Sequence, residues 1–184
     1  MKFLPYSIPM AILASSLVSA NAADLSLDAS KSWLKFDASA TGHSFDGKLK
    51  KFDAEVSGDA TSLTPSAVSL TWDFKDLDTD EPKRDVEMLK WLEYGKSPKG
   101  SFQMTKSWVD GSGVTWVQGT LKIHSIAKSI AFPIQTSKNG DHVKIEGQVW
   151  IDYQNFGLPI VRNMAIMKVD PKLKISFHLE GDAK

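Results

Sequence analysis

The sequence predicts an all-β domain of antiparallel strands with one α-helix beside them. Apolar and polar residues alternate in about eight segments, a pattern typical of strands that have one buried and one exposed face. Turn-forming residues separate these segments, and one stretch between them follows helical spacing instead. Together these observations favour a single domain built around a sheet.

The predicted strands place an apolar side chain at every second position. Val68, Leu70 and Trp72, for example, alternate with polar residues, so their side chains point to one face. The clearest alternation runs through residues 67–74, 116–123, 143–152 and 173–180, and weaker alternation runs through 33–38, 49–57, 102–109 and 130–136.

Short turns are expected between these strands. Asn139-Gly140 is the strongest signal, because a type I′ hairpin turn needs positive φ at both central residues. Residues 110–113 and 58–65 contain the glycine, aspartate and proline that two further connections require. Links this short favour antiparallel neighbours.

One segment breaks the strand rhythm. Residues 80–94 follow helical spacing, with Thr79 or Asp80 as the expected cap, Pro82 in the first turn and Gly95 at the end. The apolar residues of this predicted helix are Val86, Met88, Leu89, Trp91 and Leu92. Residues 153–171 are apolar without a clean period, which fits either a bulged strand or a loop over the mouth of a barrel.

The first residues are expected to be a secretory signal peptide. The basic Lys2, the apolar run over 8–18 and the small residues Ala20 and Ala22 predict cleavage after Ala22. A membrane anchor is the alternative, but the run is too short to span a bilayer. The mature domain, residues 23–184, is therefore expected in the periplasm or outside the cell.

Composition excludes several classes of function. The chain has no cysteine, which rules out disulfides, thiolate metal ligands and a cysteine nucleophile. Its 22 lysines and arginines balance 22 aspartates and glutamates, and no basic run points to nucleic acid as a partner. His124, His142 and His178 fall on polar strand positions and are expected at the surface, without the spacing of a metal site. No catalytic motif stands out, so neither a cofactor nor enzymatic activity is expected.

The amphipathic strands can bury their apolar faces in two packed sheets or in one closed barrel. A barrel of about eight strands is either solid or holds one small ligand, and periodicity does not decide between these. A cavity lined by these faces would accept an apolar chain, whereas in a solid core the same residues would fill the interior. The residues expected to line a cavity are Phe36, Leu70, Trp72, Phe74, Leu89, Leu92, Phe102, Met104, Leu121, Ile123, Phe132, Ile134, Val149, Ile151, Phe156 and Phe177.

Short motifs spread over almost all of the mature chain resemble those of the YceI-like family. Arg84-Asp85 followed by Met88-Leu89 resembles the family's Arg-Asp-x-x-Leu helix. Ser125 stands where the family commonly has glycine after histidine, and Ser97 replaces the aromatic residue before Pro98. The other matching segments are 47–52, 66–79, Pro98 with Phe102, 119–124 with Lys128, and Tyr153 with 156–158.

This resemblance implies an extended, lipocalin-like barrel of eight antiparallel strands with one flanking helix. It also implies that a long lipid, such as a polyisoprenoid or an isoprenoid quinone, lies inside as the ligand. The lipid's identity and the oligomeric state stay open. The rival hypotheses are a solid barrel that binds another exported protein, and a hydrolase or isomerase that acts on a lipophilic substrate.

Two surface features have more than one interpretation. The pair Arg84-Asp85 is expected to be structural at the helix start, with binding of a lipid head group as the alternative. Trp116 and Trp150 fall on outward positions, where they fit either a transient membrane contact or ordinary exposed aromatics.

Overall fold

The computed structural model describes residues 22–59, 61–163 and 167–184. The predicted signal peptide lies outside the described residues except for its last residue, Ala22. The strands and helices are β1 (Ala22–Leu27), β2 (Trp33–Ala40), β3 (His43–Leu49), β4 (Asp53–Asp59), β5 (Pro65–Asp73), η1 (Phe74–Asp76), β6 (Leu77–Asp78), α1 (Pro82–Trp91), β7 (Lys99–Val109), β8 (Thr115–Ile123), β9 (Ile126–Asn139), β10 (His142–Asp152), η2 (Tyr153–Phe156), β11 (Arg162–Asn163), β12 (Met167–Lys168) and β13 (Lys172–Ala183).

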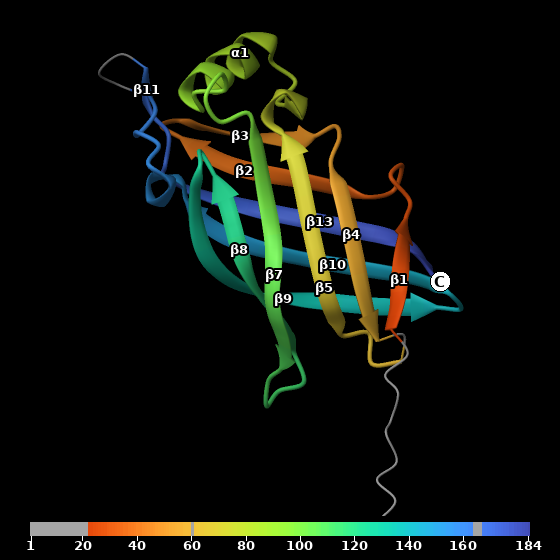
Figure 1. Ribbon diagram of the computed structural model, residues 1–184. Helices are drawn as coiled ribbons and strands as arrows, with labels where there is room; N and C mark the ends of the chain where they lie inside the picture. The colour runs from red at the N-terminus through yellow and green to blue at the C-terminus, as the bar shows by residue number, and fades with distance from the viewer. Residues whose placement is uncertain (1–21, 60, 164–166) are drawn as a thin grey trace, which may run out of the picture.

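Eight of these strands close into an antiparallel barrel, as the sequence predicts. Hydrogen bonds run around the ring in the order β1, β4, β5, β7, β8, β9, β10 and β13, and β13 returns to β1. Figure 1 shows these strands as the walls of one elongated barrel, with α1 at its upper end. A single closed barrel therefore replaces the two packed sheets that periodicity alone also allows.

The long strand β13 pairs with different strands at its two ends. One edge of β13 pairs with β10 along its whole length, from Lys172 to Asp182. Its other edge pairs with β1 through 181–183 and with β2 through 174–178. Strands β2 and β3 thus extend the wall toward the α1 end of the barrel, where Figure 1 places them.

The strand predictions were wrong at the start of the barrel. The strand expected over 49–57 forms only from Asp53 onward, as part of β4, because β3 ends at Leu49 and residues 50–52 lie in no strand. Strands β1 and β3 were not predicted at all. Both are short, and β3 carries polar residues on most positions, so neither has a clear alternation of its own.

The predicted helix forms, with a shorter extent and a different cap. Helix α1 runs from Pro82 to Trp91, and the Glu81 carboxylate accepts a hydrogen bond from the Lys83 N–H. Proline suits the first helical position because a backbone N–H there would have no partner within the helix, so the helix loses no hydrogen bond. The expected caps, Thr79 and Asp80, lie outside the helix, and Asp80 instead adopts a positive φ of 58°.

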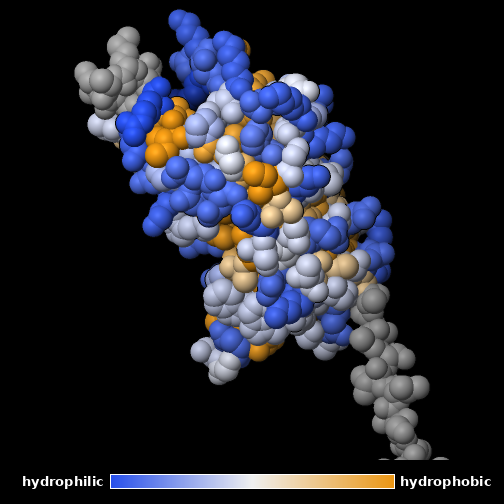
Figure 2. All heavy atoms as spheres, turned by 60° about the vertical axis from the view of Figure 1, so that its left-hand side comes forward, coloured by the Kyte–Doolittle hydropathy of each residue, from blue (hydrophilic) through white to orange (hydrophobic). Residues whose placement is uncertain are grey.

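The buried apolar side chains form two clusters. The larger cluster lies inside the barrel and includes Phe102, Phe132 and Phe156. The smaller one packs α1 and η2 against the barrel and centres on Phe74, Leu92, Tyr153 and Leu158. The face shown in Figure 2 is mostly hydrophilic, with hydrophobic atoms exposed only in separate small groups.

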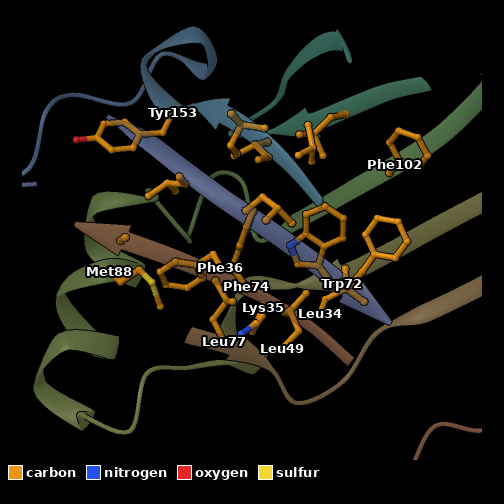
Figure 3. A pocket seen from close by; sticks show the side chains of 18 of the residues that line it. Leu34, Lys35, Phe36, Leu49, Trp72, Phe74, Leu77, Met88, Phe102 and Tyr153 are labelled. Carbon is orange, nitrogen blue, oxygen red and sulfur yellow. The ribbon is translucent and has the colours of Figure 1, made fainter. Parts of the chain in front are cut away.

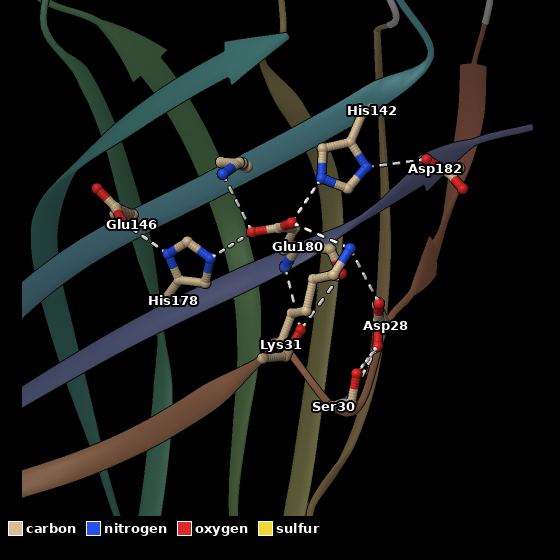
Figure 4. Close-up of polar contacts among 10 residues, drawn as sticks. Asp28, Ser30, Lys31, His142, Glu146, His178, Glu180 and Asp182 are labelled. Carbon is tan, nitrogen blue, oxygen red and sulfur yellow. Dashed lines mark hydrogen bonds and ion pairs between the residues drawn. The ribbon is translucent and has the colours of Figure 1, made fainter. Parts of the chain in front are cut away.

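A polar cluster on the outside joins β10 to β13. Glu180, only 7% exposed, accepts hydrogen bonds from His142 at 2.7 Å and His178 at 2.9 Å (Figure 4). The other ring nitrogens of these histidines lie 2.9 Å from Asp182 and 2.7 Å from Glu146. Hydrogen bonds from His178 first, then His142, lower the pKa of Glu180 to about 2. Contacts with Asp182 first, then Glu180, raise the pKa of His142.

The histidines were expected to be exposed, and this prediction was wrong for His124, whose side chain is 18% exposed, and for His178, whose side chain is only 13% exposed. Its ring stacks on Trp33 with centroids 5.9 Å apart. Trp33 comes from β2, a distant part of the chain, so the strand pattern around His178 carried no sign of this cover.

Candidate ligand-binding cavity

The interior of the barrel is a cavity of about 940 Å³ with an apolar wall. This volume lies near the upper end of the roughly 300–1,000 Å³ seen for small-molecule sites. Figure 3 shows aromatic and aliphatic side chains from several strands and from α1 turned toward the same space. The solid barrel considered from the sequence is therefore excluded.

Glycines on neighbouring strands hold three aromatic rings against the wall. In each case the aromatic residue is the direct cross-strand partner of a glycine, and a Cβ added to that glycine would lie 2.2–2.5 Å from ring atoms. The ring therefore covers the bare glycine backbone instead of reaching toward the barrel axis, which leaves the centre open. The three pairs are Phe36 with Gly47, Trp72 with Gly100, and Phe177 with Gly147.

Most residues that the sequence singled out lie on the cavity wall. Many of them, including Leu70, Trp72 and Phe177, are only partly buried because they are accessible from the cavity side. The predicted residues found on the wall are Phe36, Leu70, Trp72, Phe74, Leu92, Phe102, Leu121, Ile123, Phe132, Ile134, Val149, Ile151 and Phe177.

Three predicted residues lie elsewhere. Leu89 packs in the smaller core cluster, because α1 presents Met88, Trp91 and Leu92 to the cavity instead. Met104 packs against the larger cluster at the point where the pairing of β7 with β8 shifts register. Phe156 in η2 is 2% exposed and packs within the larger cluster.

The described parts of the irregular segment, residues 153–163 and 167–171, cover one end of the cavity, one of the two arrangements expected from its sequence. Tyr153, Leu158 and Val161 contribute to the wall. The Trp91 Nε1–H donates to the Pro159 carbonyl at 2.8 Å, which fastens the segment to α1. The Tyr153 hydroxyl donates to the Val169 carbonyl at 3.2 Å, and burial raises the pKa of this phenol.

Sequence reasoning assigned Leu92 at the end of α1 to the wall correctly but missed other wall residues of α1 and of the covering segment. Met88, Trp91, Tyr153 and Leu158 all line the cavity. The helical pattern indicated which face of α1 is apolar, but the apolar stretch after Tyr153 has no period from which inward positions could be read.

Charged wall residues gather at the α1 end of the cavity. Lys83, Arg84 and Glu87 belong to α1, and Arg162 belongs to β11, which Figure 1 places at the same end. Lys35 on β2 also borders the cavity, and its ammonium lies 5.7 Å from the Trp33 ring centroid. The rest of the wall is mostly apolar, so an apolar ligand there would contact carbon atoms and few charged groups.

In the described part of the chain, no group of three histidine or acidic side chains is arranged to hold a metal ion. None of the helices in that part has the length and apolarity to span a bilayer.

The sequence matches the model of the YceI-like domain over residues 25–181. The chain belongs to the YceI-like family. Among curated relatives, a UPF0312 protein of Vibrio campbellii is 25% identical over 195 residues, covering 100% of both chains. A UPF0312 protein of Ectopseudomonas mendocina is 29% identical over 126 residues, covering 65% of this chain and 66% of the relative.

Solved structures of this family share the fold. BcnA of Burkholderia cenocepacia superposes with a TM-score of 0.75 at 21% identity, over 84% of this chain and 99% of BcnA. A domain of Saccharophagus degradans described as a polyisoprenoid binding domain gives a TM-score of 0.67 at 16% identity, over 89% of this chain and 98% of that domain. At these identities the likeness establishes the barrel architecture.

Proposed function

We propose that this YceI-like protein binds one long apolar lipid, of the polyisoprenoid or isoprenoid quinone type, inside its barrel. It acts as a carrier, store or scavenger of that lipid and has no enzymatic activity. The observation that carries the proposal is the 940 Å³ cavity with its apolar wall. A structural neighbour described as a polyisoprenoid binding domain supports the same ligand class.

The energetics of burial favour such a ligand. Each buried methylene contributes about 0.8 kcal/mol, so a long chain gains affinity along its whole length without polar contacts. At roughly 30 Å³ for each water-sized group, a cavity of 940 Å³ has room for about 30 methylene-sized groups. This capacity corresponds to a chain of about six isoprene units.

Export and transient membrane contact belong to the same proposal. The signal-like N-terminus supports a periplasmic or secreted location, where a lipid of this kind needs a carrier because it hardly dissolves in water. Trp150 is 65% exposed and Trp108 is 36% exposed on the outer wall. Such amphipathic rings suit brief contact with a membrane surface during lipid exchange.

The proposal is tested by measuring lipid binding to residues 23–184 after organic solvent has removed any lipid already bound. Native mass spectrometry with a polyprenol of about six isoprene units should show one lipid per chain, in keeping with the capacity estimated above. A protein whose mass stays unshifted across a range of polyprenols and isoprenoid quinones would refute the proposal.

Neighbouring residues on β9 offer a matched pair of variants. Ile134 lines the cavity and is 5% exposed, whereas Gln135 points outward and is exposed. Ile134→Glu should abolish lipid binding, because the chain would have to contact a carboxylate, while Gln135→Glu should leave binding unchanged. Circular dichroism checks that both fold, and Ile134→Thr provides a milder polar change if the glutamate prevents folding. Equal affinity of the Ile134 and Gln135 variants would place the lipid outside the barrel.

A further inference from the structure

The hairpin formed by β7 and β8 projects from the barrel at the end opposite α1, as Figure 1 shows. The pairing of β7 with β5 ends at Gln103, and among the described residues β7 continues from there with β8 alone, as far as Val109. The Ser107 hydroxyl donates to the Pro65 carbonyl at 2.6 Å, which fixes the root of the hairpin to the barrel. The tip therefore extends into solvent from a fixed base.

A bulge in β7 turns the aromatic and basic residues of the hairpin to its outer face. The register shifts between Met104 and Lys106, so the extra residue Thr105 reverses the alternation that points Met104 into the core. Lys106 and Trp108 consequently lie on the outer side, where Trp108 is the cross-strand partner of Trp116. Bulges are common where a strand has to aim a side chain in a new direction.

The outer face of the hairpin carries an ordered aromatic pair beside a cation. The rings of Trp108 and Trp116 stack with their centroids 6.0 Å apart and their planes 11° from parallel. The Lys106 ammonium lies 5.0 Å from the Trp108 ring centroid, and within the described ranges it forms no ion pair. The Asp110 carboxylate accepts from the Trp116 Nε1–H at 2.9 Å and from two backbone N–H groups of the turn. Its charge is thus compensated within the hairpin, whereas that of Lys106 stays available.

Apolar side chains gather at the tip of the same hairpin. Val109 is 53% exposed, Val114 is 38% exposed and Trp108 is 36% exposed. The other large apolar side chains that are exposed in the described part of the chain are spread over α1, β9 and β10. Single exposed apolar residues are ordinary, but a group of them on a projecting hairpin indicates an interaction surface.

The size and chemistry of this tip fit a bilayer surface. A stable protein interface uses about 20–30 residues on each side, far more than the tip offers. A bilayer requires fewer residues, because each inserted side chain removes its own apolar surface from water. Indole rings suit the level of the lipid head groups, and a nearby lysine attracts anionic phospholipids.

We infer that the tip of the β7–β8 hairpin is a membrane-docking element, which inserts Val109 and Val114 among the head groups of an anionic phospholipid bilayer. The indole pair then lies at the level of the head groups, and Lys106 contacts lipid phosphates. The inference rests on the proposed function and deepens it by naming the surface that contacts the membrane. A barrel docked in this way keeps its α1 end free.

The cysteine-free chain allows a direct test with single labels. Val114→Cys and the matched control Val86→Cys each take one environment-sensitive fluorophore, because Val86 is also exposed, at 52%, but lies on α1. On vesicles of phosphatidylcholine with a quarter phosphatidylglycerol, the label at residue 114 should shift its emission to the blue, since it enters apolar surroundings. The emission of the label at residue 86 should stay unchanged.

Vesicle flotation measures how much the tip contributes to binding. Val109→Asp/Val114→Asp should weaken binding about tenfold or more, because two carboxylates replace the side chains that leave water. Val86→Asp should bind as the wild type does. Lys106→Gln should weaken binding about fivefold on vesicles with phosphatidylglycerol and leave binding to pure phosphatidylcholine vesicles unchanged. Thermal unfolding checks that each variant keeps the barrel.

Several results would overturn the docking element: an emission shift at residue 86 in place of residue 114, no binding of the wild type to vesicles, or wild-type binding by the folded double aspartate variant. Equal loss of binding in Val86→Asp would also overturn it. The double aspartate variant should keep wild-type affinity for a polyprenol, which separates docking from lipid binding inside the barrel. A protein that docks on vesicles but binds no polyprenol would refute the proposed function alone.

Discussion

Replacing Gly100 by alanine should narrow the cavity through Trp72. A Cβ at Gly100 would lie 2.2 Å from two atoms of the Trp72 indole, and the three atoms nearest to that Cβ all belong to this ring. Normal contact between carbon atoms needs about 3.5 Å, so the ring has to move by roughly 1.3 Å. The barrel backbone blocks movement outward, which leaves the cavity as the free direction.

The displacement can be converted into an affinity change. An indole shifted this far occupies about 60 Å³ of the cavity, the space of about two methylene groups at roughly 30 Å³ each. Excluding two methylenes from the wall costs about 1.6 kcal/mol. The dissociation constant for a polyprenol that fills the cavity should therefore rise about fifteenfold.

A displacement titration with a fluorescent lipid measures this change, and thermal unfolding checks that the barrel is intact. Gly111→Ala is the matched control, because a Cβ there has no neighbour within 4 Å, and its affinity should be that of the wild type. The double variant Gly100→Ala/Trp72→Leu should recover most of the loss, since the smaller side chain leaves room for the Cβ. Wild-type affinity in a folded Gly100→Ala protein, or no recovery in the double variant, would refute the role assigned to the glycine and aromatic pairs.

Three further outcomes are expected. The pKa of Glu180, lowered to about 2 from 4.5, contributes stability above pH 4.5 that is lost as pH falls toward 2. Because folding raises the pKa of His142 from 6.5, this group contributes stability below pH 6.5 that is lost as pH rises through the raised value. The melting temperature should therefore be highest between pH 4.5 and pH 6.5. His142→Gln should reduce the fall of the melting temperature on the alkaline side. Phe156→Ala should destabilise the fold by about 3–5 kcal/mol in chemical denaturation, yet leave the lipid affinity of the folded protein unchanged because Phe156 is not on the cavity wall. Trp150→Ser should slow lipid transfer to vesicles without altering equilibrium affinity, and an unchanged transfer rate would exclude a membrane contact at this ring.

Two departures from the family pattern turn out to be one structural unit. Ser125, where the family commonly has glycine, has a φ of 63°, in the region that glycine adopts most easily. Its hydroxyl lies 2.7 Å from that of Ser97, the residue that replaces an aromatic. Ser97 is 6% exposed, so its hydroxyl needs a partner inside the protein. The sequence shows each departure separately, and only the fold brings the two hydroxyl groups together.

Most strands of the barrel, though not β1, and the direction of most inward side chains follow from the sequence alone. Leu121, Phe132, Ile134 and Val149 could be assigned to the interior because side chains alternate across a strand with period two. The same local rule assigned Met104 to the cavity wall wrongly, because the register shift in β7 depends on the pairing with β8.

Whether these side chains enclose a cavity or fill a core depends on the tertiary structure. It depends on which residues face one another across strands, as Trp72 faces Gly100, because a ring that lies on bare backbone leaves the barrel centre open. It depends also on α1 and the segment after Tyr153, whose contacts with the barrel come from residues distant in sequence. Local periodicity records which face of an element is apolar, and the packing partner of that face is fixed only when the whole chain has folded.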